Sequence, residues 1–398
     1  MNLEKLWLLL VLAISCWKIK EGDAKSRAGD SILKFNMKLF QNLLTQEEEN
    51  VVISPASIYT SLAMLQQGSY GSSKVQLSKI LRSSPYHTRH RFRQIIRSFQ
   101  SLGNSTLEFA NRVFVQSGLQ IEPRYRSIVT RDFFSDVEGV NFTSASDAAV
   151  AINSWVANHT HERIPELLSP QKIQSDQKLL LASAIYFKSA WEQEFDKSLT
   201  VNSTFSPSPG KELNVSCMTS ISQYLAGENH KYGFKWVQIP FKGNRFTMLL
   251  VLPNEKYTVN ELLKKMPSKS VYYLLKHSYS SDVVLKIPKF RLVSEEVQII
   301  SALKKMGLKD VFKGGKTDLR LISKEPLYLS DIVHKAELEI DEEGAVASAA
   351  TGVGAMPLSA VQRPVLTFHA DHPFAAFVVD RQNNIPLFSA RIVDPTKI

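Results

Sequence analysis

The spacing of hydrophobic residues changes along the chain from a helical period to a strand period. Between Ser31 and Leu44, and again over residues 147–168, apolar side chains recur at the spacing of one helical face. Both segments are therefore predicted to be helices. A short buried strand is predicted from Asn50, ending at Ser54-Pro55 and leading into a further helix. Helices thus dominate the first 170 residues.

The rest of the chain is predicted to be rich in strands. Residues 179–187 form a nearly continuous apolar run, which is typical of a strand covered on both faces. Further apolar runs at 234–239, 246–252 and 283–287 are also predicted strands. Residues 327–340 alternate between apolar and charged positions near their end, the pattern of a strand with one buried face.

Length and composition point to one large globular domain. At about 100 to 200 residues per domain, 398 residues would predict two or three domains. However, no Pro/Gly/Ser-rich linker, charge run or internal repeat marks a boundary in the middle of the chain. The content of 44% hydrophobic and 22% charged residues excludes a disordered or fibrous protein. We therefore predict a single mixed α and β domain.

The N-terminus and the glycosylation motifs predict a secreted protein. Lys5 precedes an apolar run, Leu6–Cys16, that is too short to cross a bilayer and is typical of a signal peptide. Residues 1–24 are assigned to this signal, with cleavage between residues 15 and 24. Five Asn-x-Ser/Thr motifs are candidate glycosylation sites, at Asn104, Asn141, Asn158, Asn202 and Asn214.

The cysteine content and the charge narrow the chemistry. Cys16 and Cys217 cannot form a disulfide framework, and once the signal is removed Cys217 is expected to be a buried, inert thiol. The net charge of +10 favours anionic partners without choosing among polysaccharide, nucleic acid and anionic membrane.

The segment after Ile340 combines the features of a loop and of a buried strand. The acidic run Asp341-Glu342-Glu343 and Gly344 are followed by twenty residues, 345–364, with one charge and no aromatic side chain. Loops of this length without structure of their own are usually functional or disordered. Alternate positions are small and uncharged, so the segment could enter a sheet as a central strand; these positions are Ala345, Ala347, Ala349, Thr351, Val353 and Ala355. The alternative is a flexible Ala/Gly loop without a role.

Five separated segments resemble the serpin family in sequence and in order. The segments are Asn50–Ile58 with Leu62–Gly71, Ile152–Leu168, Leu181–Phe195, Val333–Gly344 and Asp371–Pro395. The resemblance extends from about residue 28 to the C-terminus. It implies an α+β fold, a single domain of three β-sheets and about nine helices, with an exposed reactive-centre loop at residues 344–364.

The resemblance also implies a mechanism. In inhibitory serpins a target protease attacks the exposed loop, and the cut loop inserts into the main sheet together with the acylated protease. The hinge of this loop, Glu342 and Gly344 to Ala349, contains small residues after the glycine, whereas a charge or proline there would oppose burial. The chain is therefore predicted to be an inhibitory serpin, with a non-inhibitory carrier or chaperone as the alternative.

Family spacing, fourteen residues after Gly344, places the attacked bond at Leu358-Ser359. Leucine before the cut suits proteases with an apolar primary pocket, so chymotrypsin-like, cathepsin G-like or elastase-like enzymes are the expected partners. Arg363 could suggest a trypsin-like target, but Pro364 follows it and makes that bond a poor substrate. The protein is expected to act as a monomer.

The resemblance further assigns residues that control opening of the main sheet. Ser54, Ser57, Ser183 and His334 correspond to the family's shutter, and Trp191 to its breach. Three positions depart from the usual pattern. Ser183 replaces an Asn that partners the histidine, so the polar cluster must be satisfied differently. Ala345 replaces a Thr or Ser, and Ala390 replaces a Gly.

A basic segment between Arg82 and Arg97 predicts a polyanion site. Helical spacing places Arg89, Arg93 and Arg97 along one flank, at a position that resembles the heparin-binding helix of some serpins. Heparin or another glycosaminoglycan is thus a candidate effector, and a heparin-activated thrombin inhibitor is an alternative function. The alternative is that these arginines form a solvated helix face without a ligand.

Motifs for other functions are incomplete. The chain has no Gly-x-Ser-x-Gly nucleophile elbow, and Gly315-Lys316-Thr317 lacks the upstream glycine of a phosphate-binding loop because Asp310 occupies that position. The histidine pairs His159 with His161 and His369 with His372 lack further ligands for a metal. No nucleic-acid-binding motif is present. We therefore predict that the protein is not an enzyme and that it has no cofactor and no metal site. We also predict no nucleic-acid partner and no membrane span.

Overall fold

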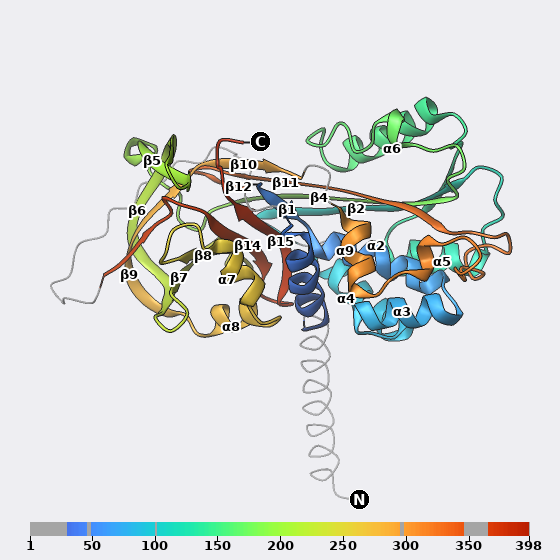
Figure 1. Ribbon diagram of the computed structural model, residues 1–398, viewed down its shortest axis with the longest axis horizontal. Helices are drawn as coiled ribbons and strands as arrows, with labels where there is room; N and C mark the ends of the chain where they lie inside the picture. The colour runs from blue at the N-terminus through green and yellow to red at the C-terminus, as the bar shows by residue number, and fades with distance from the viewer. Residues whose placement is uncertain (1–29, 46–48, 100–101, 295–297, 346–364, 398) are drawn as a thin grey trace, which may run out of the picture.

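The computed structural model describes residues 30–45, 49–99, 102–294, 298–345 and 365–397 (Figure 1). The predicted signal peptide with its cleavage site therefore lies outside the described residues. So do Ala347, Ala349 and the predicted reactive bond Leu358-Ser359.

The helices lie mostly in the first part of the chain, as the apolar spacing predicts. Residues 30–43 are helical, and Ser54 caps the next helix by accepting a hydrogen bond from the Ser57 backbone N–H, with Pro55 in the first turn. The other α-helices are α2 Pro55–Gly68, α3 Gly71–Leu81, α4 Pro85–Phe99, α5 Pro123–Phe133, α6 Ala145–His159, α7 Val259–Lys265, α8 Ser270–Lys276 and α9 Ile299–Met306.

The strands form two hydrogen-bonded sheets in the described part of the chain. One has six strands in the order β10-β11-β12-β4-β2-β3. The other has nine, in the order β1-β15-β14-β8-β7-β6-β9-β13, with β5 paired to β6. Their bounds are β1 Val51–Ile53, β2 Ser105–Gln116, β3 Val137–Val140, β4 Leu179–Ala190, β5 Val201–Ser208, β6 Lys211–Asn229, β7 Phe234–Pro240, β8 Phe246–Pro253, β9 Tyr279–Pro288, β10 Phe290–Val293, β11 Leu329–Ile340, β12 Gly344–Ala345, β13 Leu366–His369, β14 Phe374–Asp380 and β15 Ile385–Ile392.

The α+β fold class and the predicted strands are confirmed, and the third expected sheet is continuous with the second. The reason is the length of β6, which pairs with β5 over residues 211–217 and with β7 over residues 225–229. β9 pairs with β6 along its whole length. The second and third expected sheets therefore share the long strands β6 and β9.

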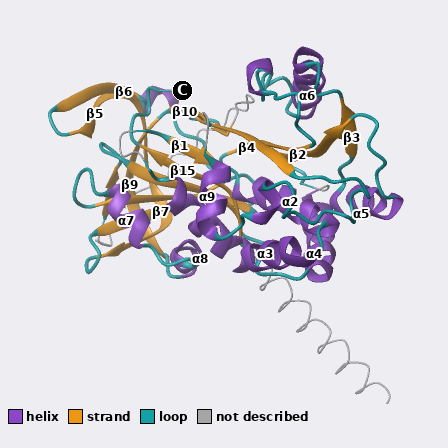
Figure 2. Ribbon diagram, turned by 45° about the vertical axis from the view of Figure 1, so that its right-hand side comes forward, coloured by secondary structure: helices purple, strands orange, loops and turns teal. Residues whose placement is uncertain are grey.

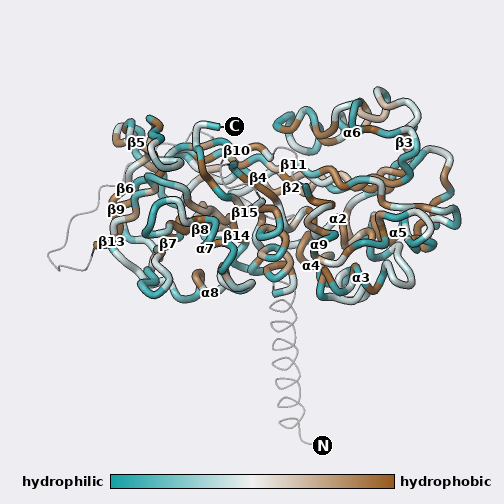
Figure 3. The backbone as a smooth tube through the Cα atoms, in the orientation of Figure 1, coloured by the Kyte–Doolittle hydropathy of each residue, from teal (hydrophilic) through white to brown (hydrophobic). Residues whose placement is uncertain are grey.

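The helices cover the six-stranded sheet on both faces. Figures 1 and 2 show α6 above this sheet and the group α2 to α5 with α9 below it. Hydrophobic segments gather along β8, β14 and β15 in the centre of the molecule (Figure 3), where every residue of these strands is buried. Ala390, in β15, is completely buried between Val52 and Ala376. The six-stranded sheet, which is the main sheet of the fold, thus packs on a large apolar core.

The predicted helix over residues 147–168 is wrong in its second half. α6 ends at His159, and His161 and Glu162 then adopt left-handed backbone conformations with φ of 51° and 60°. Ile164 and Leu168 still pack in the small core beneath α6. Their helical spacing arose because the chain turns back onto the same core, not because one helix continues.

Candidate functional site

The six-stranded sheet is closed at one end and opens at the other, between β4 and β11. The two strands pair in parallel from Leu179 with Leu329 as far as Ile185 with Ala336. Beyond this point they no longer pair with each other, and β12 lies between them. The opening is therefore wide enough for one further strand.

The first residues of the hinge already occupy this opening. Ala345 pairs with Ser189 of β4 and with Ile340 of β11, both antiparallel, and is 1% exposed. Gly344 has a φ of 147°, and a Cβ there would lie 2.2 Å from the backbone oxygen of Ser189. Glycine is required at this position because any side chain would clash with β4.

Trp191 closes the top of the opening, where the sequence places the breach. Its side chain is fully buried and stacks on Phe241, with ring centroids 4.4 Å apart. The indole Nε1–H donates to the Asp341 carbonyl at 2.9 Å, and the Trp191 backbone N–H donates to the Glu343 carbonyl at 2.9 Å. The indole thus holds the turn that leads from β11 into the hinge.

Glu342 anchors the same turn through its carboxylate. The side chain accepts from Thr200 Oγ1 at 2.8 Å and lies 2.9 Å from Lys289 Nζ, although the residue is only 5% exposed. Burial alone would raise the pKa of Glu342, but the bonds from Lys289 and Thr200 outweigh it and lower the pKa below its usual value. The carboxylate is therefore a charged anchor at neutral pH.

The four shutter residues meet below the closed part of the sheet. Ser183 of β4 lies opposite His334 of β11, and their side chains meet with 3.0 Å between Ser183 Oγ and His334 Nδ1. Ser57 Oγ, from α2, lies 2.9 Å from Ser183 Oγ, and the Ser54 backbone N–H donates to His334 Nε2 at 2.9 Å. The smaller Ser183 still bridges β4, β11 and α2.

The shutter contains a fifth residue that the sequence analysis missed. Asn111, opposite Ser183 on β2, accepts from Ser57 Oγ at 2.7 Å through its Oδ1. Ser183 of β4 replaces the Asn that is usual in the family. The amide of the shutter is therefore supplied by Asn111 of β2. The available signal was the uncharged polar residue Asn111, next to Arg112, within the otherwise apolar run 109–115, because a buried polar group in such a run needs a partner.

The neutral form of His334 is set by its neighbours. A backbone N–H can only donate, so His334 Nε2 must accept from Ser54 and cannot carry a proton. Nδ1–H then donates toward Ser183, whose backbone oxygen lies at 3.1 Å. Burial lowers the pKa of His334 to about 3, against a bond to the Ser183 backbone that works to raise it. Protonation would therefore break the contact between α2 and β11.

Stability should fall in acid because of this histidine. An unfolded histidine titrates near 6.5, so between pH 6.5 and about 3 the unfolded chain binds the extra proton. Its contribution is therefore complete above pH 6.5 and is lost as the pH falls toward 3, at up to about 1.4 kcal/mol per pH unit. We expect urea unfolding from pH 7 to 4 to show a shallower decline in His334→Gln. Parallel curves for the two proteins would contradict this role.

The comparisons with known proteins agree with this geometry. A family model described as "Serpin (serine protease inhibitor)" matches residues 30–395. The chain is a serpin. It is 31% identical to Antichymotrypsin-2 of Bombyx mori over 89% of this chain and 95% of that protein. It is 32% identical to Leukocyte elastase inhibitor A of Mus musculus, over 91% and 97%. A crystal structure of native protease nexin-1 with heparin superposes with a TM-score of 0.84 at 27% identity, covering 94% of this chain and 99% of that one.

The segment that follows α6 contacts the six-stranded sheet of this serpin through Arg163. Arg163 Nη2 donates to Glu337 Oε1 at 2.6 Å and also to Glu339, both on β11. Burial works to lower the pKa of Arg163, but the two carboxylates outweigh it and raise the pKa. Sequence analysis assigned Arg163 to a helix and therefore missed this contact, which ties β11 to the segment that follows α6.

The predicted basic stripe on α4 is only partly available to a ligand. Arg89 Nε lies 3.2 Å from Asp132 Oδ2, and Arg93 Nη1 lies 3.6 Å from Asp132 Oδ1, where Asp132 is buried in α5. Arg97 is exposed at the end of α4. Two of the three arginines therefore neutralise a buried carboxylate within the protein.

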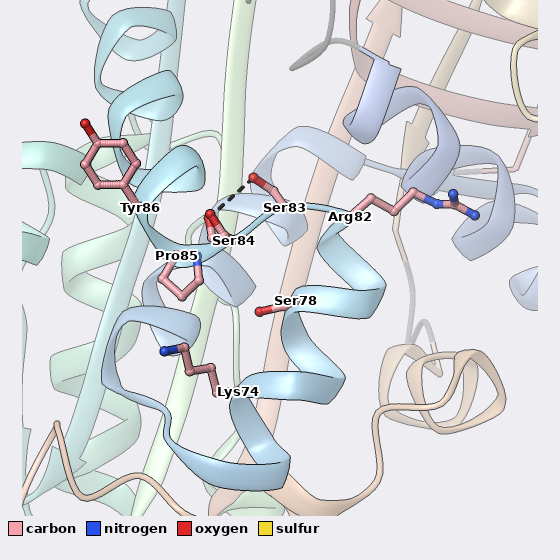
Figure 4. A pocket seen from close by; sticks show the side chains of 7 residues that line it. All are labelled: Lys74, Ser78, Arg82, Ser83, Ser84, Pro85 and Tyr86. Carbon is pink, nitrogen blue, oxygen red and sulfur yellow. Dashed lines mark hydrogen bonds between the residues drawn. The ribbon is translucent and has the colours of Figure 1, made fainter.

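A hollow of about 700 Å³ beside the start of α4 adds no second focus of positive charge. Lys74 and Arg82 both line it. Figure 4 shows the Arg82 side chain extending beyond Ser83 and pointing away from Lys74. The two cations therefore do not converge on one ligand.

The remaining candidate residues have ordinary surroundings. Cys217 is buried, and burial raises the pKa of its thiol, which favours an inert cysteine. Within the described ranges, no group of three or more His, Cys, Asp or Glu residues could bind a metal. No helix there is long and apolar enough to cross a membrane. All five candidate glycosylation sites are exposed, at Asn104, Asn141, Asn158, Asn202 and Asn214.

Proposed function

We propose that this serpin is a secreted inhibitor of serine proteases that acts as a suicide substrate. The observation that carries the proposal is the position of β12, because Gly344 and Ala345 already pair with β4 and β11. The small residues that follow in the sequence could extend this strand, whereas a charged or proline-containing hinge would favour a carrier. The apolar run at the N-terminus and the exposed glycosylation motifs support secretion.

The proposed reaction begins as an ordinary proteolysis. The protease serine attacks the carbonyl carbon of Leu358, forms an ester with it and releases the amino group of Ser359. The hinge then extends from Ala345 between β4 and β11, which must give up their direct pairing from Ile185 with Ala336 downward. The ester survives if insertion displaces the protease before water hydrolyses it.

The proposed targets are chymotrypsin-like, cathepsin G-like or elastase-like proteases, because Leu358 would fill an apolar primary pocket. The names of the antichymotrypsin and the leukocyte elastase inhibitor among the relatives support these classes.

We expect chymotrypsin, cathepsin G or neutrophil elastase to form a denaturant-stable complex with this protein. The measurement is gel electrophoresis after incubation, with mass spectrometry of the C-terminal peptide, which should begin at Ser359. Leu358→Arg is the matched variant, because a charged primary residue should abolish the reaction with chymotrypsin and favour trypsin. Complete loop cleavage with the protease still active would overturn the proposal.

A second candidate function is a thrombin inhibitor activated by heparin. It is favoured by exposed Arg97 at the end of α4 and by the similarity to protease nexin-1, whose structure contains heparin. The partial insertion of β12 also supports it, because a ligand could increase loop exposure by releasing a hinge that is held in the sheet. The pairing of Arg89 and Arg93 with Asp132 weighs against a strong site.

This second function predicts a salt-dependent effect of heparin. Heparin at low salt should accelerate thrombin inhibition, and Arg97→Ala should weaken heparin affinity with a salt slope lower by about 1, by the counterion-release argument used for nucleic acids. Arg320→Ala is the control, because Arg320 is exposed but pairs with Asp318. A thrombin inhibition rate that heparin leaves unchanged at low salt would exclude this function.

A further inference from the structure

A basic surface lies on the side of the molecule opposite β13, the strand that follows the loop in the chain (Figure 3). It is formed by α3 and by the chain that runs from α9 through the short 3-10 helix η3, Asp310–Phe312, to residue 324. Residues 71–82 have three basic side chains and no acidic one, and residues 303–324 have seven basic and two acidic ones. These two stretches therefore hold an excess of eight positive charges, against +10 for the whole chain.

Hydrogen bonds join the two stretches into one surface. The backbone N–H groups of Lys309 and Asp310 donate to Gln76 Oε1 at 2.8 and 3.0 Å. Nearer the start of α3, the Asp318 backbone N–H donates to Ser73 Oγ at 3.0 Å. The lysines around η3 thus lie beside those of α3.

The cations of this surface are exposed and separate from one another. They are Lys74 and Lys79 of α3, with Lys309, Lys313, Lys316 and Arg320 of the second stretch. Its two acidic residues have local partners. Asp318 pairs with Arg320 at 2.8 Å, and Asp310 is hydrogen-bonded to Ser72 and Gln76. Within the described ranges none of the five lysines is in a salt bridge, so their charge is available to a partner.

Large apolar side chains are exposed among these cations. They are Val75 at 66%, Tyr86 at 65%, Tyr70 at 51% and Leu321 at 45% exposure. Arg320, next to Leu321, lies over the Tyr70 ring at 5.0 Å from its centroid. Tyr86 borders the hollow that Lys74 also lines. The surface is therefore amphipathic as well as basic.

We propose that this surface binds anionic phospholipid membranes. Separate cations suit a membrane, because each of them meets a different headgroup, whereas a compact anion needs cations that converge. Exposed apolar side chains add to such binding by entering the interfacial layer, and tyrosine suits that layer because its ring is apolar and its hydroxyl polar. A sulfated polysaccharide would use the cations and leave the apolar side chains in water. The membrane is therefore the favoured partner.

Vesicle sedimentation tests the proposal directly. We expect the purified protein to sediment with vesicles of phosphatidylserine and phosphatidylcholine, and to bind phosphatidylcholine vesicles about tenfold more weakly or less. Added salt should weaken binding, because it screens the charges. Hydrogen-exchange mass spectrometry should show protection by the mixed vesicles in residues 70–86 and 309–321. Equal binding to the two vesicle types, or protection elsewhere only, would overturn the proposal.

A pair of lysines measures the contribution of this surface. Lys313→Ala with Lys316→Ala should weaken binding to the mixed vesicles about 25-fold, since each lysine near an anionic bilayer contributes about fivefold. The matched control is Lys211→Ala with Lys231→Ala, which removes the same charge from exposed positions at the start of β6 and before β7. Circular dichroism would show that both variants are folded. An equal loss in both variants would mean that only net charge matters and would refute the site.

The apolar side chains distinguish a membrane from a polysaccharide. Tyr70→Ser with Val75→Ser keeps every cation, so it should weaken vesicle binding about threefold or more and leave binding to immobilised heparin unchanged. Tyr279→Ser with Val201→Ser, at exposed positions in β9 and β5, is the matched control and should change neither. Unchanged vesicle binding by the first pair would identify a polyanion surface and contradict the membrane proposal.

The consequence for inhibition rests on the function proposed above, whereas membrane binding does not. Because β13 lies opposite this surface, a bound molecule presents the end that carries the loop to the solution (Figure 3). Complex formation with chymotrypsin should therefore proceed at an unchanged rate on vesicles. Sedimentation needs no protease, so failure of membrane binding and failure of inhibition are seen separately. Loss of inhibition on binding to vesicles would refute this orientation.

Discussion

Replacing Ala345 by arginine is expected to convert this serpin from an inhibitor into a substrate of its target protease. Ala345 is 1% exposed and lies between Ser189 of β4 and Ile340 of β11. An arginine there would have to be buried without a partner each time the hinge inserts, at a cost of several kcal/mol. Each 1.4 kcal/mol added to the insertion barrier slows insertion about tenfold, while ester hydrolysis is unaffected.

The measurement is the ratio of covalent complex to cleaved serpin on a denaturing gel, together with the number of serpin molecules consumed per protease inhibited. Ala345→Arg should yield cleaved serpin and active protease. Ala345→Ser is the control, because a serine fits a small buried position and should keep most of the inhibition. A normal yield of complex from the arginine variant would show that the hinge does not enter the sheet.

Replacing Glu342 by lysine should destabilise the top of the main sheet and promote association between molecules. The variant loses the acceptor for Thr200 and places a second cation beside Lys289, which is 2.9 Å from the present carboxylate. The carboxylate end of this pair is buried and the lysine end is half-exposed, so losing its bonds and burying an ammonium in its place costs on the order of 1 to 3 kcal/mol. The hinge turn would be released from Trp191, and an unfilled opening between β4 and β11 could accept a strand from another molecule.

Thermal unfolding and size-exclusion chromatography after mild heating test this expectation. Glu342→Lys should lower the midpoint of unfolding and form oligomers, whereas Glu342→Gln, which keeps an oxygen for Thr200, should have a smaller effect. The double variant Glu342→Lys with Lys289→Glu exchanges the two charges and should restore part of the stability, because the ion pair is re-formed. The restoration should be incomplete, because Lys289 is more exposed than Glu342 and the exchange buries the ammonium in place of the carboxylate. An unchanged midpoint in the single lysine variant would show that the ion pair does not hold the turn.

Local patterns along the sequence predicted most elements because each segment buries one type of face. The apolar run at residues 179–187 and the alternation before Ile340 correspond to β4 and β11. The helix over 147–168 failed because periodicity shows which residues face a core but not whether one helix carries them. Asn111 and Arg163 were missed because their partners, Ser57 and Glu337, are 54 and 174 residues away in the chain.

The sequence by itself determined the family, the order of helices and strands, and a hinge of small residues, since these depend on residue type and local spacing. The tertiary structure alone decided that Gly344 and Ala345 already lie between β4 and β11. It also decided that Asp132 engages two of the three predicted arginines, and that Asn111 completes the shutter while its Nδ2 is left without a partner among the described residues. These contacts depend on which residues, far apart in the sequence, become neighbours when the chain folds. Charges and buried polar groups are paired by neighbours in space, and local spacing along the sequence does not show those neighbours.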